Sequence, residues 1–352
     1  MERVMAELAN QFVQKENLEL HLVLYGIDQE QFYELDQRVI IHKPSFKFNN
    51  RFRFISTIKT LLFLRSEISK IRPLAVLSFG EMWNNFVLLA LFFKPFPIYV
   101  SDRSQPDKPL GLLHENLRKL LYPRAKGLIA QTSRAQKHYQ RLLRHNNITV
   151  IGNPIRSIEH VNNEILDKEN IVLMVGRLIQ SKNQDRLVRI FAEITNKDWK
   201  LVLVGYDHLK QNYIQKVKET IAELGIGHQV ILAGKQTDVE SYYLKSKIFA
   251  FTSSSEGFPN VIGEAMSAGL PIVSYDCSAG PSDLVKHGQN GFLIPEFDDS
   301  YFKECLQELM QNDALATQMG QVSKELIQEF EIGKISEKYY QFIISNENTV
   351  IK

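Results

Sequence analysis

Two glutamates, with a turn between a predicted strand and a predicted helix, make residues 252–268 the stretch best suited to chemistry. Glu256 opens a Glu-Gly-Phe-Pro turn, and Glu264 lies eight residues further along the chain. The apolar run 248–251 predicts a buried parallel strand, and the Gly-Leu-Pro sequence at 269–271 is typical of a helix end. The helix between them would offer free backbone N–H groups to an anion, with both carboxylates beside it. Such a site suits a ligand that joins phosphate to hydroxyl-rich rings, for example a nucleotide-sugar.

Two basic residues follow the first apolar run of the second half of the chain. Arg177 and Lys182 lie in the loop after residues 171–175, at the carboxyl end of a predicted strand, where open α/β sheets bind ligands. A planar guanidinium and an ammonium point charge can together neutralise a diphosphate. Taken alone, two basic loop residues are also explained as solvated surface charges.

Three ordered motifs in the C-terminal half resemble those of glycosyltransferase family 4, the retaining transferases with the two-domain GT-B fold. Residues 256–266 (Glu-Gly-Phe-Pro-Asn-Val-Ile-Gly-Glu-Ala-Met) resemble its paired-glutamate motif. Residues 175–178 (Val-Gly-Arg-Leu), followed by Lys182 and Asn183, are similar to its basic donor-phosphate motif, and residues 288–295 resemble its later turn and strand. The N-terminal half resembles the family in pattern more than in motif. The resemblance implies an α/β protein with two Rossmann-like, doubly wound parallel-sheet domains facing a cleft.

The resemblance also implies a role for each motif residue. Glu256 would be the catalytic residue, contacting hydroxyls of the donor sugar, and Glu264 would bind the ribose. Arg177 and Lys182 would bind the donor phosphates. The remaining expected donor-binding residues are Gly257, Phe258, Pro259, Asn260 and Val261. Capping of the helix is an alternative explanation for the asparagine in this list.

Neither a metal nor an organic cofactor is expected. No Asp-x-Asp follows a predicted strand, and no Gly-x-Gly-x-x-Gly phosphate-binding loop follows one either. The charge of a departing diphosphate would then be met by Arg177, Lys182 and the helix N-terminus. The nucleotide-sugar would be a co-substrate, and no nucleic acid partner is expected.

Alternating apolar and helical segments predict parallel sheets that are covered by helices on both faces. Strands are predicted at 18–25, 38–42, 74–79, 98–101, 127–131 and 148–151, and again at 171–175, 200–204, 229–233, 247–251, 271–275 and 291–294. The 352 residues are enough for two domains of about 150 residues each. We expect an N-terminal acceptor-side domain at 1–153, a linker at 154–170 and a nucleotide-sugar donor-binding domain at 171–333. The resemblance implies that the C-terminal helix, 334–352, packs back on the N-terminal domain.

The start of the chain departs from the resembled family. Residues 2–5 (Glu-Arg-Val-Met) match the start of a family helix, but the strand and glycine turn that precede this helix are absent from the sequence. The N-terminal domain is therefore predicted to lack its first strand, which would be central in the sheet. We expect either that the gene product begins about 10–20 residues upstream, a span set by one strand and its turn, or that this form is poorly active and unstable. Further along, the strand at 98–101 leads into Asp102 and Arg103, which are possible cleft residues.

Charge is distributed unevenly along the chain. Residues 1–165 carry 23 Lys and Arg against 15 Asp and Glu, and the run 46–54 alternates aromatic and basic residues. Contact with an anionic membrane would explain this composition, but solvated charges and core aromatic residues explain it as well. No apolar run approaches the roughly 20 residues of a membrane-spanning helix, and the two cysteines indicate no disulfide framework. A cytoplasmic protein is expected, with peripheral contact to the inner face of the cytoplasmic membrane left open.

These observations predict a retaining glycosyltransferase of the hexosyltransferase type. It would move a sugar from a nucleotide-sugar, expected to be a UDP-sugar, to a hydroxyl of a glycan or lipid-linked glycan in surface polysaccharide biosynthesis. Two alternatives stay open. A GT-B nucleotide-sugar isomerase would form product without an acceptor, and a non-catalytic, truncated binding protein would form none.

Overall fold

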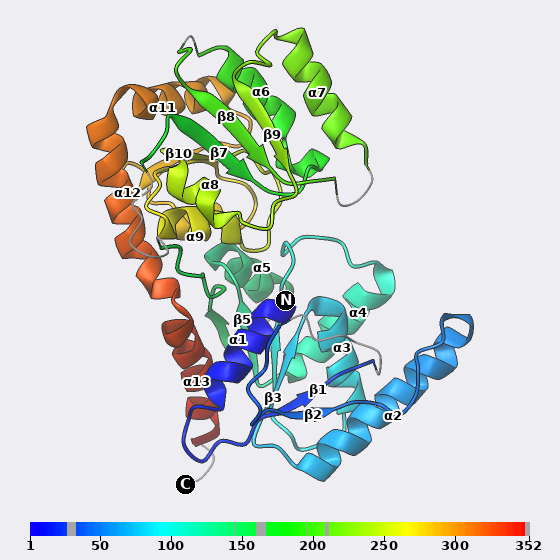
Figure 1. The fold of residues 1–352 in the computed structure, drawn as a ribbon. Coiled ribbons are helices and arrows are strands. Elements are labelled where there is room, and N and C mark those ends of the chain that lie inside the picture. Colours follow the sequence, from blue (N-terminus) through cyan, green and yellow to red (C-terminus); the bar gives the residue numbers. More distant parts are fainter. Residues whose placement is uncertain (27–32, 144, 160–166, 195, 208–210, 349–352) are drawn as a thin grey trace. The chain divides into compact units, whose positions relative to one another are not determined.

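The computed structural model describes residues 1–352 except 27–32, 144, 160–166, 195, 208–210 and 349–352. The chain forms two compact units (Figure 1). The N-terminal unit comprises Met1–Pro154 and Ile332–Lys352, and the C-terminal unit comprises Ile155–Glu331. Each unit is an α/β layer structure built on parallel strands.

The C-terminal unit is built on one parallel sheet, for which the described residues supply six strands in the order β12-β11-β10-β7-β8-β9. The strands are β7 (Ile171–Val175), β8 (Lys200–Val204), β9 (Val230–Gly234), β10 (Ile248–Phe251), β11 (Ile272–Tyr275) and β12 (Gly291–Ile294). Each lies where the sequence predicts a strand. From β7 the chain first builds outward through β8 and β9, then returns to the other side of β7 with β10. The strand order therefore reverses between β7 and β10, which places a ligand-binding crevice at their carboxyl ends.

Helices cover both faces of this sheet (Figure 1). They are α6 (Gln184–Ala192), α7 (Tyr213–Glu223), α8 (Glu240–Lys245), α9 (Asn260–Ser267), α10 (Pro281–Leu284), α11 (Asp299–Gln311) and α12 (Asp313–Ile327). Side chains along β7 alternate between two hydrophobic clusters: Val172 packs with residues of α6, α7 and α11, whereas Leu173 packs with residues of α8 and α9. Burial on both faces explains why the strand is a continuous apolar run.

The N-terminal unit contains two separate parallel sheets in its described residues, β3-β4-β5-β6 and β1-β2. The strands are β1 (His21–Val23), β2 (Ile40–His42), β3 (Val76–Phe79), β4 (Ile98–Ser101), β5 (Gly127–Ala130) and β6 (Ile148–Val150). The strands predicted at 18–25 and 38–42 are shorter than expected. The sequence predicts one parallel sheet for this unit, whereas its described strands form two.

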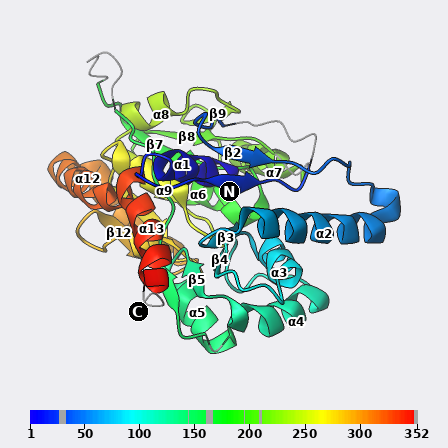
Figure 2. The ribbon, with the colours of Figure 1, turned by 90° about the horizontal axis from the view of Figure 1, so that it is seen from below.

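Six helices are described in the N-terminal unit: α1 (Glu2–Phe12), α2 (Arg53–Ile71), α3 (Glu81–Ala90), α4 (Leu112–Leu121), α5 (Ser133–Leu143) and α13 (Ile332–Asn348). Helices α1 and α13 lie side by side in both views (Figures 1 and 2). Lys15 Nζ pairs with a Glu337 carboxylate oxygen at 2.6 Å, just beyond the end of α1. The Tyr99 hydroxyl on β4 donates to the backbone oxygen of Ile343 at 3.1 Å, so α13 is also tied to the sheet.

Candidate functional site

The site begins where the loops after β7 and β10 meet, at the reversal of strand order. The backbone N–H of Ser254 donates to the Ser181 carbonyl at 2.9 Å. The Asn183 side chain donates to the Thr252 carbonyl at 2.9 Å, and the Thr252 hydroxyl donates to the Lys182 carbonyl at 3.0 Å. These bonds tie the basic loop to the loop that carries Glu256. Two segments that lie about seventy residues apart in the sequence thus form one binding surface.

Lys182 and Glu256 form an ion pair across this junction. Their side chains are only 12% and 13% exposed, respectively, and the Lys182 ammonium also lies 5.5 Å from the centre of the Phe251 ring. The sequence separates the two residues into a phosphate-binding and a sugar-binding motif, and no pattern in it predicts their pairing. An ammonium and a carboxylate side by side suit a ligand in which a phosphate adjoins hydroxyl groups.

Arg177 lies in the same loop but is placed differently. It is exposed, and among the described residues no carboxylate contacts its guanidinium. Its backbone carbonyl accepts a hydrogen bond from the Gln184 side chain at 2.9 Å, which fixes the loop against the start of α6. The guanidinium is therefore available to an incoming anion without first losing a carboxylate partner.

The turn after Glu256 and Gly257 is anchored by packing. Phe258 is buried and its ring centre lies 5.7 Å from that of Phe330. Pro259 is the N-cap residue of α9, and Asn260 is the first residue of the helix, with no side-chain cap bond at this end. Asn260 thus does not occupy the N-cap position itself. At the start of α9 the N–H groups of Asn260 and Ile262 already donate to the Phe258 and Pro259 carbonyls. The Val261 N–H has no acceptor among the described residues and is available to an anion.

Glu264 is held by a residue that the sequence analysis did not single out. The Tyr243 hydroxyl, on α8, donates to a Glu264 carboxylate oxygen at 3.0 Å. Burial, reinforced by the Glu264 charge, raises the pKa of Tyr243 well above its ordinary value, so the phenol stays protonated and remains a donor. Tyr243 fixes one carboxylate oxygen of Glu264 and leaves the other to a ligand.

The thiol of Cys277 lies near the Glu256 carboxylate but is not a nucleophile. Burial and the nearby Glu256 carboxylate raise the pKa of Cys277 to about 12, so this group stays a neutral thiol. No group of three or more His, Cys, Asp or Glu side chains arranged to hold a metal ion occurs in the part of the chain that the structure describes.

Asp102 and Arg103 lie in the N-terminal unit, directly after β4. Asp102 is interior, with a side chain 1% exposed, and pairs with Arg118 at 3.2 Å while accepting from the Tyr122 hydroxyl at 2.6 Å. Burial raises the pKa of Asp102 to about 6, against the opposing effect of the Arg118 guanidinium. Arg103 donates to the Tyr339 hydroxyl of α13 at 3.0 Å. Glu81, which the sequence analysis also passed over, accepts from the Arg103 backbone N–H at 2.8 Å and so shapes this loop.

The comparisons with known proteins bear on this geometry. The family model described as "Glycosyl transferases group 1" matches residues 156–326, which include both motif loops, α9 and Glu264. This segment of the chain belongs to the group 1 glycosyltransferases. The predicted family and the predicted enzyme class are both confirmed.

Three relatives are similar to the chain over longer stretches than this segment. An uncharacterized glycosyltransferase of Haemophilus influenzae is 32% identical over 60% of this chain, a match that spans 59% of that relative's length. The amylovoran biosynthesis glycosyltransferase AmsD of Erwinia amylovora is 26% identical over 86% of the chain and 84% of its own length. An α-1,4-N-acetyl-D-galactosaminyltransferase of Campylobacter jejuni, named for an undecaprenol-diphosphate-linked glycan, is 24% identical over 99% of the chain and 95% of its own length.

Solved structures agree on the fold. A glycosyltransferase from Rickettsia africae superposes with a TM-score of 0.82 at 15% identity, covering 98% of this chain and 94% of that one. Anabaena HepE, solved in complex with UDP, gives a TM-score of 0.79 at 17% identity, covering 98% and 96% of the two chains. This group 1 glycosyltransferase has the GT-B fold, as predicted.

The buried pair in the N-terminal unit gives a stability prediction. Asp102→Asn keeps the shape of the side chain but leaves the Arg118 guanidinium buried without a counter-charge, so it should lower the free energy of unfolding by roughly 3–5 kcal/mol. Urea unfolding followed by circular dichroism measures this change. Asp107→Asn, at an exposed position of the following loop, is the matched control and should be nearly neutral. Equal stability of the two variants would show that the pair contributes nothing to the fold.

Proposed function

We propose that this glycosyltransferase moves a sugar from a UDP-sugar to a hydroxyl of a glycan or lipid-linked glycan in surface polysaccharide biosynthesis, with retention of anomeric configuration. The observation that carries the proposal is the joining of Arg177, the Lys182–Glu256 pair and the α9 N-terminus at one edge of the sheet. The UDP complex of Anabaena HepE and the names of the Erwinia and Campylobacter relatives support the donor and acceptor classes.

The cationic groups would act on the leaving diphosphate. Arg177 offers two parallel N–H donors to phosphate oxygens, and Lys182 adds a point charge that neutralises the developing negative charge. The Val261 N–H at the start of α9 would donate to the distal phosphate. Because these groups are fixed by the packed loops, the site is preorganised for the charge that develops as the bond to the sugar breaks.

The carboxylates would act on hydroxyl groups. Glu256 would accept hydrogen bonds from the donor sugar and hold it against the acceptor, while Glu264, held by Tyr243, would accept from the ribose. In the transfer itself, the bond between the anomeric carbon and the diphosphate breaks, and the acceptor oxygen bonds to the same face of that carbon. The acceptor proton passes to an oxygen of the departing diphosphate.

The basic loop gives a binding prediction. Arg177→Ala and Lys182→Ala should each weaken UDP binding by roughly 1.5–3 kcal/mol, the scale of a hydrogen bond to a charged group. Isothermal titration calorimetry with UDP measures the change. Lys218→Ala, an exposed lysine on α7, is the control and should bind as the wild type does. Unchanged affinity in both loop variants would remove these residues from the donor site.

Substitutions of Glu256 and Glu264 should affect turnover and UDP affinity differently. Glu256→Gln removes the charge that addresses the sugar, so turnover should fall far more than UDP affinity does. Glu264→Gln should weaken UDP itself, and Tyr243→Phe should do so to a smaller degree because it only releases the Glu264 carboxylate. Steady-state kinetics and UDP titration on the same preparations supply both quantities. Equal loss of UDP affinity in the two glutamate variants would contradict this division of roles.

A lipid-linked acceptor requires an approach to the membrane, and α2 offers a surface for it. Its outward face and the residue before it expose large apolar side chains, among them Phe52, Phe54 at 77% and Leu62 at 60% exposure. In both views the N-terminal end of α2 projects from the rest of its unit (Figures 1 and 2). Arg51 and Arg53 adjoin this apolar face, a combination that suits the headgroup region of an anionic bilayer. From this surface we propose peripheral contact at the inner face of the cytoplasmic membrane. None of the described helices has the length and apolarity needed to cross a membrane.

Charge reversal tests the membrane proposal. Each basic side chain near an anionic surface contributes about 1 kcal/mol, so Arg51→Glu with Arg53→Glu should release the protein from vesicles rich in anionic lipid in a flotation assay. Lys137→Glu with Arg141→Glu changes the net charge equally on α5 and should leave flotation unchanged. If the wild-type protein does not float with these vesicles, the membrane proposal is wrong.

A further inference from the structure

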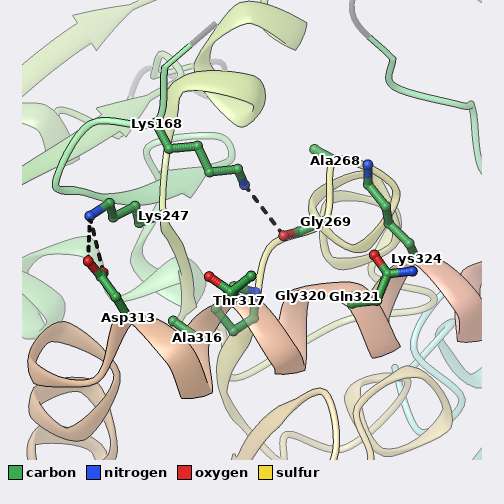
Figure 3. Close-up of a pocket in the computed structure, with 11 residues that line it drawn as sticks. Lys168, Lys247, Ala268, Gly269, Asp313, Ala316, Thr317, Gly320, Gln321 and Lys324 are labelled. Atoms are coloured by element: carbon green, nitrogen blue, oxygen red, sulfur yellow. Dashed lines mark hydrogen bonds and ion pairs between the residues drawn. The ribbon is translucent and has the colours of Figure 1, made fainter. Parts of the chain in front are cut away.

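A lysine-rich pocket lies in the C-terminal unit, away from the loops that carry the donor motifs. Its lining includes Lys247 and Pro271, which come directly before β10 and β11, and Lys168, which comes shortly before β7. It is therefore at the amino edge of the sheet, whereas the donor loops follow the carboxyl ends of the same strands. Helix α12 forms the opposite wall, and the pocket encloses about 300 Å³ (Figure 3).

The charges in this pocket do not balance. Lys247 pairs with Asp313 at 3.1 Å. Lys168 donates only to the Gly269 carbonyl, at 3.4 Å, and no carboxylate of the described residues pairs with Lys168 or Lys324. Lys168 is exposed as a whole residue, but its ammonium turns toward the Gly269 carbonyl in the pocket (Figure 3). The enclosure of this ammonium, together with the charge of Lys324, lowers the pKa of Lys168 to about 8.

The pocket wall is built by a close approach of two backbones. A Cβ on Gly320 would lie 2.3 Å from the Gly269 carbonyl oxygen, so only glycine lets α12 approach the turn between α9 and β11 this closely. A Cβ on Gly269, whose φ is +73°, would in turn meet Lys324 Cε at 2.8 Å. The stem of Lys324 therefore lies against Gly269 and lines the pocket, although Lys324 as a whole residue is exposed.

Polar and apolar groups complete the lining. Asp313, Thr317 and Gln321 recur at four-residue intervals and so share with Lys324 one face of α12. Ala268, Pro271 and Ala316 supply apolar contact area. The pocket therefore combines two cations that lack a carboxylate partner, a hydroxyl group, an amide and a small apolar surface.

We propose that this pocket binds a small organic phosphate, whose phosphate group is held by the ammonium groups of Lys168 and Lys324. The Thr317 hydroxyl supplies a further donor, and the apolar residues contact the carbon skeleton. An anion between the two like charges removes their mutual repulsion, and each contact is a charge-assisted hydrogen bond. The inference does not depend on the proposed donor chemistry, because no residue of the donor loops lines this pocket.

A simpler explanation predicts different behaviour. Lys168 lies near the C-terminal end of α9, whose last carbonyl groups attract cations. If that attraction were the whole role of the two lysines, replacing them would change stability alone, and phosphate would have no effect beyond that of chloride at the same ionic strength.

The test is isothermal titration calorimetry of the full chain at pH 8, with ionic strength held constant by sodium chloride. Inorganic phosphate and a hexose 1-phosphate are the two probes, and tighter binding of the ester identifies an organic phosphate as the occupant. Lys168→Gln and Lys324→Gln should each weaken binding about tenfold or more, and the control Lys218→Gln should not. UDP affinity should stay unchanged in all three, which separates this site from the donor site.

Proton linkage gives a second readout that a purely structural lysine would not produce. Bound phosphate should return the pKa of Lys168 toward its ordinary value, so binding at pH 8 should be accompanied by proton uptake. Titrations in two buffers of different ionisation enthalpy report this uptake, which should be smaller in Lys168→Gln. Binding of neither probe above the chloride background, or equal binding in the wild type and both pocket variants, would overturn the proposal. Testing two separate lysine variants keeps it falsifiable if one of them fails to fold.

Discussion

The proposed donor site depends on the hydrogen bonds that tie the loop after β7 to the loop after β10. A largely enclosed ammonium and carboxylate lose much of their hydration. Their mutual attraction offsets this cost only when the two groups are held in good geometry. The backbone bond from Ser254 to Ser181 and the bond from the Asn183 side chain to the Thr252 carbonyl supply that geometry. The reversal of strand order makes this possible, because it brings the carboxyl ends of two strands together with no helix between them.

The sequence predicts most of the C-terminal sheet because strands that are buried on both faces are continuous apolar runs. The apolar runs that became β7 and β10 could be recognised without any tertiary information, and the residues just after them could be placed at the ligand-binding edge. Contacts between side chains of elements that are distant in the sequence produce no such pattern. Nothing in the spacing of Lys182 and Glu256, or of Tyr243 and Glu264, indicates that they touch, since each contact is set by how two loops or two helices pack.

The N-terminal unit was harder to predict for a related reason. Its first two strands are three residues long and only partly buried, so they are too short for periodicity to define their ends. Asp102 shows a second limit: a polar residue at the end of a strand indicates a site exposed to ligand, but here the neighbouring Arg118, Tyr122 and Asn84 enclose it. The position of a residue in the sequence can show that it lies at the end of a strand. Its role also depends on the side chains that surround it, and these come from other parts of the fold.

The Lys182–Glu256 ion pair also implies that Lys182 and Arg177 contribute differently to the proposed donor site. Glu256 neutralises Lys182 in the ion pair, so an incoming diphosphate must share that ammonium with a carboxylate that remains close by. Arg177 is exposed and loses no carboxylate partner when a phosphate binds. A larger part of the ground-state affinity should therefore come from Arg177, while Lys182 contributes most when the leaving diphosphate gains charge. In the proposed mechanism Glu256 would turn to the sugar hydroxyls and release the Lys182 ammonium toward the diphosphate. Binding of the sugar and stabilisation of the leaving group would then be coupled through one side-chain contact.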